Sequence, residues 1–101
     1  MKKIEAIIRK TKFDDVYRTL EGSGIGGLTV QDVRGFGRHR NGLRDWVRLE
    51  IYADEFQIEK TVDMILKTAR SGDGAGDGKV VVINIDNIYR VSTGEAGANA
   101  V

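Results

Sequence analysis

The chain has 101 residues, of which 41% are hydrophobic and 31% are charged, and its formal net charge is +1. These values predict a single soluble globular domain over residues 1–101, with no global charge to attract nucleic acid or membranes. The absence of cysteine excludes disulfides, zinc–thiolate sites and thiol chemistry.

Residues 1–10 lack the apolar region of a signal peptide, and no stretch of the chain nears the roughly 18 apolar residues of a membrane span, so we expect a cytoplasmic protein.

The first half of the chain predicts two strands around one helix. Apolar and polar residues alternate over residues 2–9, which predicts a strand, and helical spacing predicts an amphipathic helix over 12–21. Glycines end this helix, and β-branched residues predict a second strand over 28–36.

The second half repeats this pattern after a polar loop at residues 37–45. Strong alternation predicts a strand over 46–53, and Asp54 is the expected N-cap of a helix over 55–70. A glycine-rich loop then leads to a short apolar run over 80–85, which is typical of a buried strand. A further short extended piece is expected over residues 88–91, and the small, glycine-rich residues from Thr93 predict a mobile tail.

The predicted order is therefore β-α-β-β-α-β, which is the ferredoxin-like arrangement of the α+β class. In it, both helices cover one face of an antiparallel sheet and leave the other face open. The sequence places Ile7, Trp46 and Tyr52 on the open face. Because a large exposed apolar patch indicates a partner surface, we expect the chain to self-associate through this face.

Two glycine-rich segments end in a cation: Gly35-Phe36-Gly37-Arg38 and Gly76-Asp77-Gly78-Lys79. Glycine lets the backbone approach a ligand closely and leaves N–H groups accessible, and a neighbouring lysine or arginine attracts phosphate. No catalytic set of side chains surrounds them, and no general base for nucleotide hydrolysis is evident. The sequence therefore favours a nucleotide sensor over an enzyme.

Other motifs fail on their context. Residues 22–27 match the G-x-G-x-x-G pattern and residues 74–79 resemble a P-loop, but each lies after a helix and before a strand, the reverse of what those motifs need. A backbone anion nest in the second loop remains. Asp73 and Asp77 lack the other ligands of a calcium loop, and His39 has no partners for a metal site, so no metal site is expected.

An arginine-rich stretch offers a different reading, as a ferredoxin-like RNA-binding module. Trp46 lies within this stretch, but the several aromatic rings of a base-stacking platform are missing, so no nucleic-acid partner is expected. Its cations are Arg34, Arg38, Arg40, Arg44 and Arg48.

Several motifs, in the right order and over nearly the whole chain, resemble the PII family of signal transduction proteins. They are Met1-Lys2-Lys3-Ile4-Glu5-Ala6-Ile7-Ile8, Gly27-Leu28-Thr29-Val30, Arg34-Gly35-Phe36-Gly37-Arg38, Gly76-Asp77-Gly78-Lys79-Val80, Tyr89-Arg90 and Thr93-Gly94-Glu95. The resemblance implies a non-catalytic homotrimer whose open sheet faces line the trimer core. It also implies that adenine nucleotides bind in clefts between neighbouring subunits.

The resemblance further implies a set of nucleotide contacts. The adenine is expected near Ile7, Thr29, Gly35, Phe36, Gly37 and Glu50. The phosphates are expected to contact Gly76, Asp77, Gly78, Lys79 and Arg38, together with Arg90 of the adjacent subunit. In family terms residues 37–45 are a T-loop, residues 71–79 a phosphate-binding B-loop, and residues 92–101 a flexible C-terminal tail.

The chain departs from the family pattern at three places. The T-loop is drastically shortened, and His39 stands where the family has a glutamine that helps to bind magnesium and 2-oxoglutarate. Ser92 replaces a second phosphate-binding arginine, and the B-loop has one extra residue. These departures favour the PII-like branch.

The expected ligand of such a protein is ADP, ATP or AMP, with Mg²⁺ accompanying ATP and bicarbonate as a candidate second ligand. The regulated partner would be a transporter or a metabolic enzyme, and contact with a membrane would occur only through that partner. The alternative within the family is a nitrogen-regulatory protein that senses ATP, ADP and 2-oxoglutarate.

Overall fold

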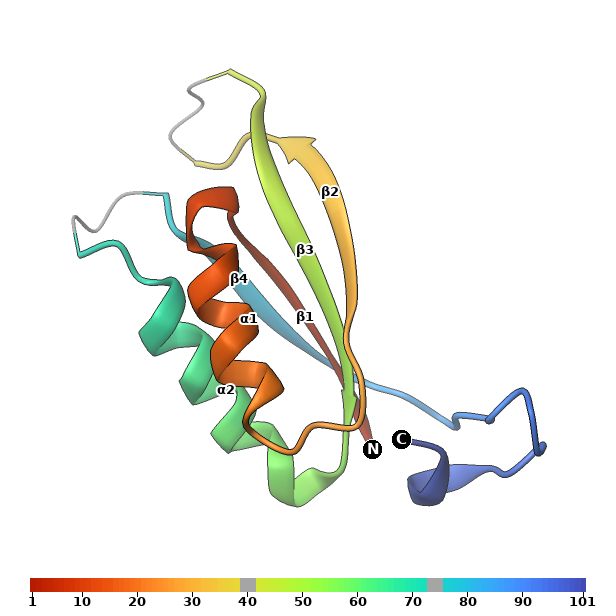
Figure 1. The fold of residues 1–101 in the computed structure, drawn as a ribbon. Helices are drawn as coiled ribbons and strands as arrows, with labels where there is room; N and C mark the ends of the chain where they lie inside the picture. Colours follow the sequence, from red (N-terminus) through yellow and green to blue (C-terminus); the bar gives the residue numbers. More distant parts are fainter. Residues whose placement is uncertain (39–41, 73–75) are drawn as a thin grey trace.

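The computed structural model describes residues 1–38, 42–72 and 76–101. Figure 1 shows a curved sheet with two helices on one face and a C-terminal arm that projects from the opposite side. The strands are β1 (Lys2–Arg9), β2 (Thr29–Gly35), β3 (Arg44–Ala53) and β4 (Gly78–Asn84). The helices are α1 (Phe13–Glu21) and α2 (Glu55–Ala69), and the short 3₁₀ turns are η1 (Lys10–Lys12) and η2 (Gly97–Ala100).

The sheet has the strand order β2-β3-β1-β4, and each neighbouring pair is antiparallel. This confirms the predicted ferredoxin-like fold. Because of these directions, β1 and β2 end at the same end of the sheet at which β3 and β4 begin. The two glycine–cation segments therefore lie at one end of the sheet.

The core fills the space between the sheet and the helices. Every second residue of β1 and β3 is buried against the helices, as the alternation of the sequence predicts. The helices contribute the apolar stripe of each amphipathic pattern. The buried hydrophobic residues are Ile4, Ala6, Ile8, Val16, Leu20, Val47, Leu49, Ile51, Ala53, Ile58, Ile65 and Ala69.

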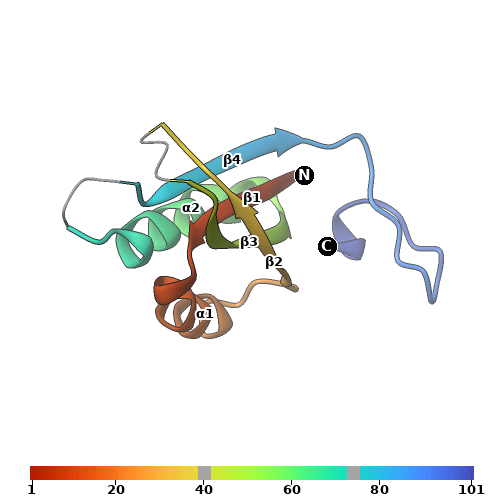
Figure 2. The same ribbon diagram turned by 90° about the horizontal axis from the view of Figure 1, so that it is seen from above.

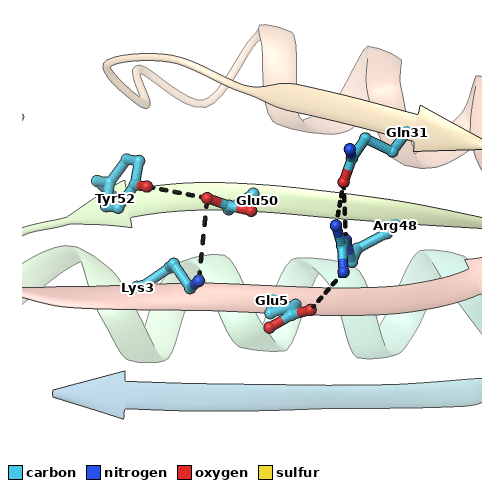
Figure 3. Close-up of polar contacts among 6 residues, drawn as sticks. All are labelled: Lys3, Glu5, Gln31, Arg48, Glu50 and Tyr52. Carbon is cyan, nitrogen blue, oxygen red and sulfur yellow. Dashed lines mark hydrogen bonds and ion pairs between the residues drawn. The ribbon is translucent and has the colours of Figure 1, made fainter. Parts of the chain in front are cut away.

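The open face of the sheet carries Ile7, Trp46 and Tyr52, each half-buried, as the sequence predicts. The expectation that this face is an apolar patch needs correction, however, because two polar clusters cross it (Figure 3). In one cluster Tyr52 donates a hydrogen bond to Glu50, and Lys3 pairs with the same carboxylate. These polar side chains satisfy one another across β1 and β3.

The second cluster on the open face centres on Arg48 of β3 (Figure 3). Its guanidinium donates to the amide oxygen of Gln31 on β2, with Nε at 3.0 Å, and its Nη1 lies 3.5 Å from Glu5 Oε1 on β1. The cluster therefore ties three adjacent strands together on the face that the helices leave open.

Several element boundaries differ from the sequence predictions. Strand β3 begins at Arg44, two residues before the predicted start at residue 46. Asp54 does occupy the N-cap of α2, but no side-chain cap bond forms there, and Gln57 N–H instead donates to the Asp54 carbonyl at 2.9 Å. Among the described residues, no helix is long and apolar enough to span a membrane.

The C-terminal arm follows β4 and leaves the sheet, as Figures 1 and 2 show. The predicted extended piece over residues 88–91 contributes one isolated bridge, between Tyr89 and Ala96. Arg90 N–H donates to the Glu95 carbonyl and Gly97 N–H to the Ile88 carbonyl, so the arm folds back on itself. The tail over residues 92–101 thus has a defined path, and its flexibility stays a prediction.

Candidate functional site

The two glycine–cation segments share one end of the sheet but lie at its opposite edges. The 35–38 segment follows β2, and the 76–79 segment leads into β4, with β3 and β1 between those strands. Three spacings between strands separate the edges, which is about 14 Å. A phosphate group bound at the backbone of one segment would therefore not touch the backbone of the other segment of the same subunit.

The backbone of the 76–79 segment has a conformation that needs glycine. Gly76 has φ +64° and Gly78 has φ +102°, both in the left-handed region. A Cβ on Gly78 would also lie 1.8 Å from the carbonyl oxygen of Ile7, so the start of β4 presses directly against β1. Lys79 follows at once and pairs with Ile7 across the two strands, so both side chains share the open face.

The side chain of Asp77 connects the two ends of the B-loop. Its Oδ2 accepts a hydrogen bond from Ser71 N–H at 3.1 Å, which joins the two ends of the loop. A cavity of about 90 Å³ lies between this loop and α2, and apolar residues of the core form its inner wall. Asp77, Gly78 and Lys79 stand at the loop side of that cavity.

Arg9 is a residue of this site that the sequence reasoning missed. It ends β1, and its Nε donates to the Gly76 carbonyl at 2.9 Å and lies 3.4 Å from Asp77 Oδ1. The predicted fold could have indicated Arg9. A ferredoxin-like sheet pairs β1 with β4 and so brings the end of β1 beside the loop that precedes β4.

The 35–38 segment begins beside the chain's single tryptophan. Trp46 Nε1–H donates to the Gly35 carbonyl at 3.2 Å. Phe36 is 57% exposed, and Arg38 is also exposed. A cavity of about 590 Å³ opens nearby, but none of the predicted nucleotide contacts lines it. Its lining residues are Lys10, Asp32, Val33, Arg34, Leu43, Asp45 and Trp46.

Thr29 and Glu50 form a separate pair, directly opposite one another on β2 and β3. The Glu50 carboxylate accepts the Tyr52 hydroxyl at 2.9 Å and lies 3.9 Å from Lys3 Nζ. The hydrogen bond to Glu50 raises the pKa of Tyr52 above its ordinary 10.0, with smaller contributions from burial and from the carboxylate charge. Glu50 is thus held in place before any ligand arrives.

Arg90 lies on the C-terminal arm, beyond the end of β4 that is remote from Lys79. Strand β4 begins at Gly78 and ends at Asn84, so Lys79 and Asn84 stand about 17 Å apart along an extended backbone. Arg90 Nη2 donates to the Asn99 carbonyl at 3.2 Å within the arm. Figure 1 shows the arm leaving the sheet at the end opposite the B-loop.

The predicted adenine contacts are likewise split within one chain. Thr29 begins β2 and Gly35 ends it, and six residue steps of extended strand span about 20 Å. That distance exceeds the size of an adenine ring. One subunit therefore cannot bring Thr29 and Gly35 to the same base, and it cannot bring Lys79 and Arg90 to the same phosphate.

The arginine-rich stretch is dispersed by the fold. Arg48 is tied to Gln31 and Glu5 on the open face, whereas Arg34, Arg38 and Arg44 are exposed. Among the described residues, no three acidic, histidine or cysteine side chains gather into a metal site. His39 and Arg40 of the T-loop, and Asp73 and Gly74 of the B-loop, lie outside the described residues.

Comparison with known proteins identifies the family. The family model described as "Nitrogen regulatory protein P-II" matches residues 1–95. Nitrogen regulatory protein P-II of Synechocystis is 38% identical over 113 aligned positions, which cover all of both chains. Nitrogen regulatory protein P-II 1 of Methanothermobacter thermautotrophicus is 41% identical over 114 positions, which cover all of this chain and 97% of the relative.

The alignment lengths show that this chain lacks positions that its relatives have. The Synechocystis alignment has 113 positions against the 101 residues of this chain, so at least 12 positions have no counterpart here. A match over residues 1–95, full-length relatives at this identity and the ferredoxin-like sheet agree with one another. The chain belongs to the PII family of signal transduction proteins.

Proposed function

We propose that this protein is a non-catalytic PII-like regulator that binds ADP, ATP or AMP between the subunits of a homotrimer. The observation that carries the proposal is the division of the predicted contacts between the two ends of the sheet. A site that uses Lys79 together with Arg90, and Gly35 together with Thr29, needs a second copy of the chain. The family assignment supports the same reading.

The chemistry of the B-loop end suits a polyphosphate. Gly76 and Gly78 are exposed residues with left-handed φ, and Lys79 supplies a positive charge beside them. Arg38 adds a second exposed cation at this end of the sheet, and Arg90 of a neighbouring subunit adds a third. Ser92 stands in place of another arginine, so the site has one cation fewer. This lowers the affinity for a triphosphate more than the affinity for a di- or monophosphate.

The open sheet face supports the assembly. Ile7, Trp46 and Tyr52 are half-buried in one subunit and would gain burial in a trimer core. The Arg48 cluster and the Glu50 cluster are already paired within each subunit, which lowers the penalty for removing their charges from water. The face is thus suited to contact with copies of itself.

The regulated partner would sense nucleotide binding through the short T-loop, which contains Arg38. A partner of this kind is a transporter or a metabolic enzyme. ATP would bring Mg²⁺ with it, and bicarbonate is the candidate second ligand near Arg38 and Arg44, whose cationic side chains are exposed. Binding of the nucleotide would change the surface that the loop presents to the partner.

Titration calorimetry with ADP, ATP and AMP tests the proposal. We expect at least one of them to bind, and we expect Lys79→Ala and Arg90→Ala each to weaken binding about 10- to 100-fold, since each removes a charged hydrogen bond. Lys67→Ala is the matched control, because Lys67 is exposed on α2 and pairs with Asp63 there. Absence of binding by all three nucleotides would refute the proposal.

A second candidate is nitrogen regulation, with 2-oxoglutarate as an additional ligand. The names of the curated relatives favour it. The shortened T-loop and His39 in place of the family glutamine argue against a 2-oxoglutarate site. Calorimetry with 2-oxoglutarate in the presence of Mg²⁺ and ATP separates the candidates: binding supports nitrogen sensing, and no binding supports the PII-like branch.

A further inference from the structure

We propose that Arg9 is the positioning residue of the B-loop, and that Asp77 serves as its anchor within the loop instead of contacting the nucleotide. This inference rests on the proposed function, because it assigns roles within the same site. It changes one prediction of the family resemblance, which counts Asp77 among the phosphate contacts. It also adds Arg9, which no sequence motif indicates.

The contacts of Arg9 reach the loop at two consecutive residues. Its Nε donates to the Gly76 carbonyl at 2.9 Å and approaches Asp77 Oδ1 to 3.4 Å. Arg9 ends β1, a strand paired on both sides within the sheet, so its backbone is firmly placed. The guanidinium therefore links the loop to one of the two central strands of the sheet.

The carboxylate of Asp77 points toward Ser71 and Arg9 of the same chain. Its Oδ2 accepts from Ser71 N–H at 3.1 Å while its Oδ1 faces Arg9, and its side chain is only 23% exposed. One carboxylate oxygen thus accepts a hydrogen bond, and the other lies within ion-pair distance of Arg9. A negative charge so placed stabilises the loop, but it would repel a phosphate that came close.

The helix side offers the loop little support. A cavity of about 90 Å³ lies between the described residues Asp77, Gly78 and Lys79 and the apolar side chains of α2, so packing between them and the helix is incomplete. Gly76, unlike Gly78, precedes the β1–β4 pairing, and without a side chain its backbone has more conformational freedom than that of other residues. The contacts from Arg9 and Ser71, together with the pairing of Gly78 to β1, therefore orient the described end of the loop.

Coulomb attraction and loop positioning predict opposite signs for one substitution. Asp77→Asn removes a negative charge beside the phosphates, so a purely electrostatic effect would tighten ADP binding. Loss of the anchor would instead weaken ADP binding, because the loop N–H groups would no longer be held in place. We expect Asp77→Asn to weaken ADP binding about fivefold, the upper range for one partly exposed ion pair.

Calorimetry with ADP and adenosine tests the role of Arg9. Arg9→Ala should weaken ADP binding about fivefold and leave adenosine binding unchanged, because adenosine lacks phosphates. Arg9→Lys should restore part of the loss, since an ammonium can still reach the Gly76 carbonyl. The double variant with Asp77→Asn should bind ADP as Arg9→Ala does, because both changes break one link. Arg18→Ala, which removes an exposed cation from α1, is the matched control.

Amide hydrogen exchange gives a readout that does not depend on nucleotide. In the free protein, Arg9→Ala should speed exchange in residues 76–78 and leave β3 unchanged. Unchanged loop exchange would overturn the inference, and so would additive losses in the double variant, which would indicate direct contact of Arg9 with phosphate. Faster exchange with unaltered ADP affinity would also overturn it while leaving the proposed function intact. If the wild type binds no adenine nucleotide, the proposed function fails, and exchange alone decides whether Arg9 holds the loop.

Discussion

The backbone carbonyl of Ile7 occupies the place where a side chain on Gly78 would begin, since a Cβ there would lie 1.8 Å from the Ile7 oxygen. This close approach joins the first residue of β4 to β1. It also fixes Lys79, the next residue, opposite Ile7 on the open face. The position of the predicted phosphate-binding lysine therefore depends on a glycine that allows two backbones to meet.

Gly78→Ala should destabilise the protein severely, by about 3 kcal/mol or more, because it combines a backbone clash with a left-handed φ. Gly72→Ala is the matched control: Gly72 has φ +92°, but a Cβ there meets nothing within 4 Å. The control should cost only about 1 kcal/mol for the backbone conformation. Urea unfolding measures both values. Equal losses would show that the contact with Ile7 has no energetic importance.

Tyr52 should make stability depend on pH in the alkaline range. Its hydrogen bond to Glu50 raises its pKa above 10.0 in the folded state, so the folded protein prefers the neutral phenol. The stabilisation is complete below the unfolded pKa and is lost as pH rises through the raised folded pKa. Between about pH 9 and about pH 11, wild type should lose more stability than Tyr52→Phe.

Chemical unfolding at the two pH values measures this difference, and near-ultraviolet absorbance follows the ionisation of Tyr52 directly. Glu50→Gln keeps a hydrogen-bond acceptor but removes the charge, so it should retain part of the pKa shift. An identical alkaline loss in wild type and in Tyr52→Phe would contradict the role assigned to this hydrogen bond.

Trp46 should report nucleotide binding through its fluorescence. Its indole N–H donates to the Gly35 carbonyl, and Gly35 begins the segment predicted to contact adenine. ADP should therefore shift the emission of this tryptophan. Inorganic pyrophosphate, which lacks the base, should shift the emission less than ADP does. Calorimetric binding of ADP without any change in emission would place the base away from the 35–38 segment.

The regular parts of the fold were predictable because their apolar residues repeat clearly. The alternation of Val47, Leu49 and Ile51 defined β3, and the spacing of Val16 and Leu20 defined the buried side of α1. The start of β3 was placed too late, because Arg44 and Asp45 are polar and resemble a loop. They belong to the strand because they pair with Gly35 and Arg34 of β2.

Long-range polar contacts were not predictable in the same way. Arg9 reads as an ordinary cation at a strand end, since its partners Gly76 and Asp77 are remote in sequence. The open face looked apolar because Trp46 and Tyr52 dominate the alternation there. Only the folded structure shows that Glu50 and Arg48 find partners on the neighbouring strands.

The most direct test of the shared site mixes two defective subunits. Lys79→Ala and Arg90→Ala chains are co-expressed in equal amounts, native mass spectrometry verifies the mixed trimers, and calorimetry counts the sites that bind ADP with wild-type affinity. If neighbouring subunits supply Lys79 and Arg90, about a quarter of the sites in a random mixture have both residues intact and regain that affinity. If one subunit supplies both residues, no site regains it, and that result would contradict the account.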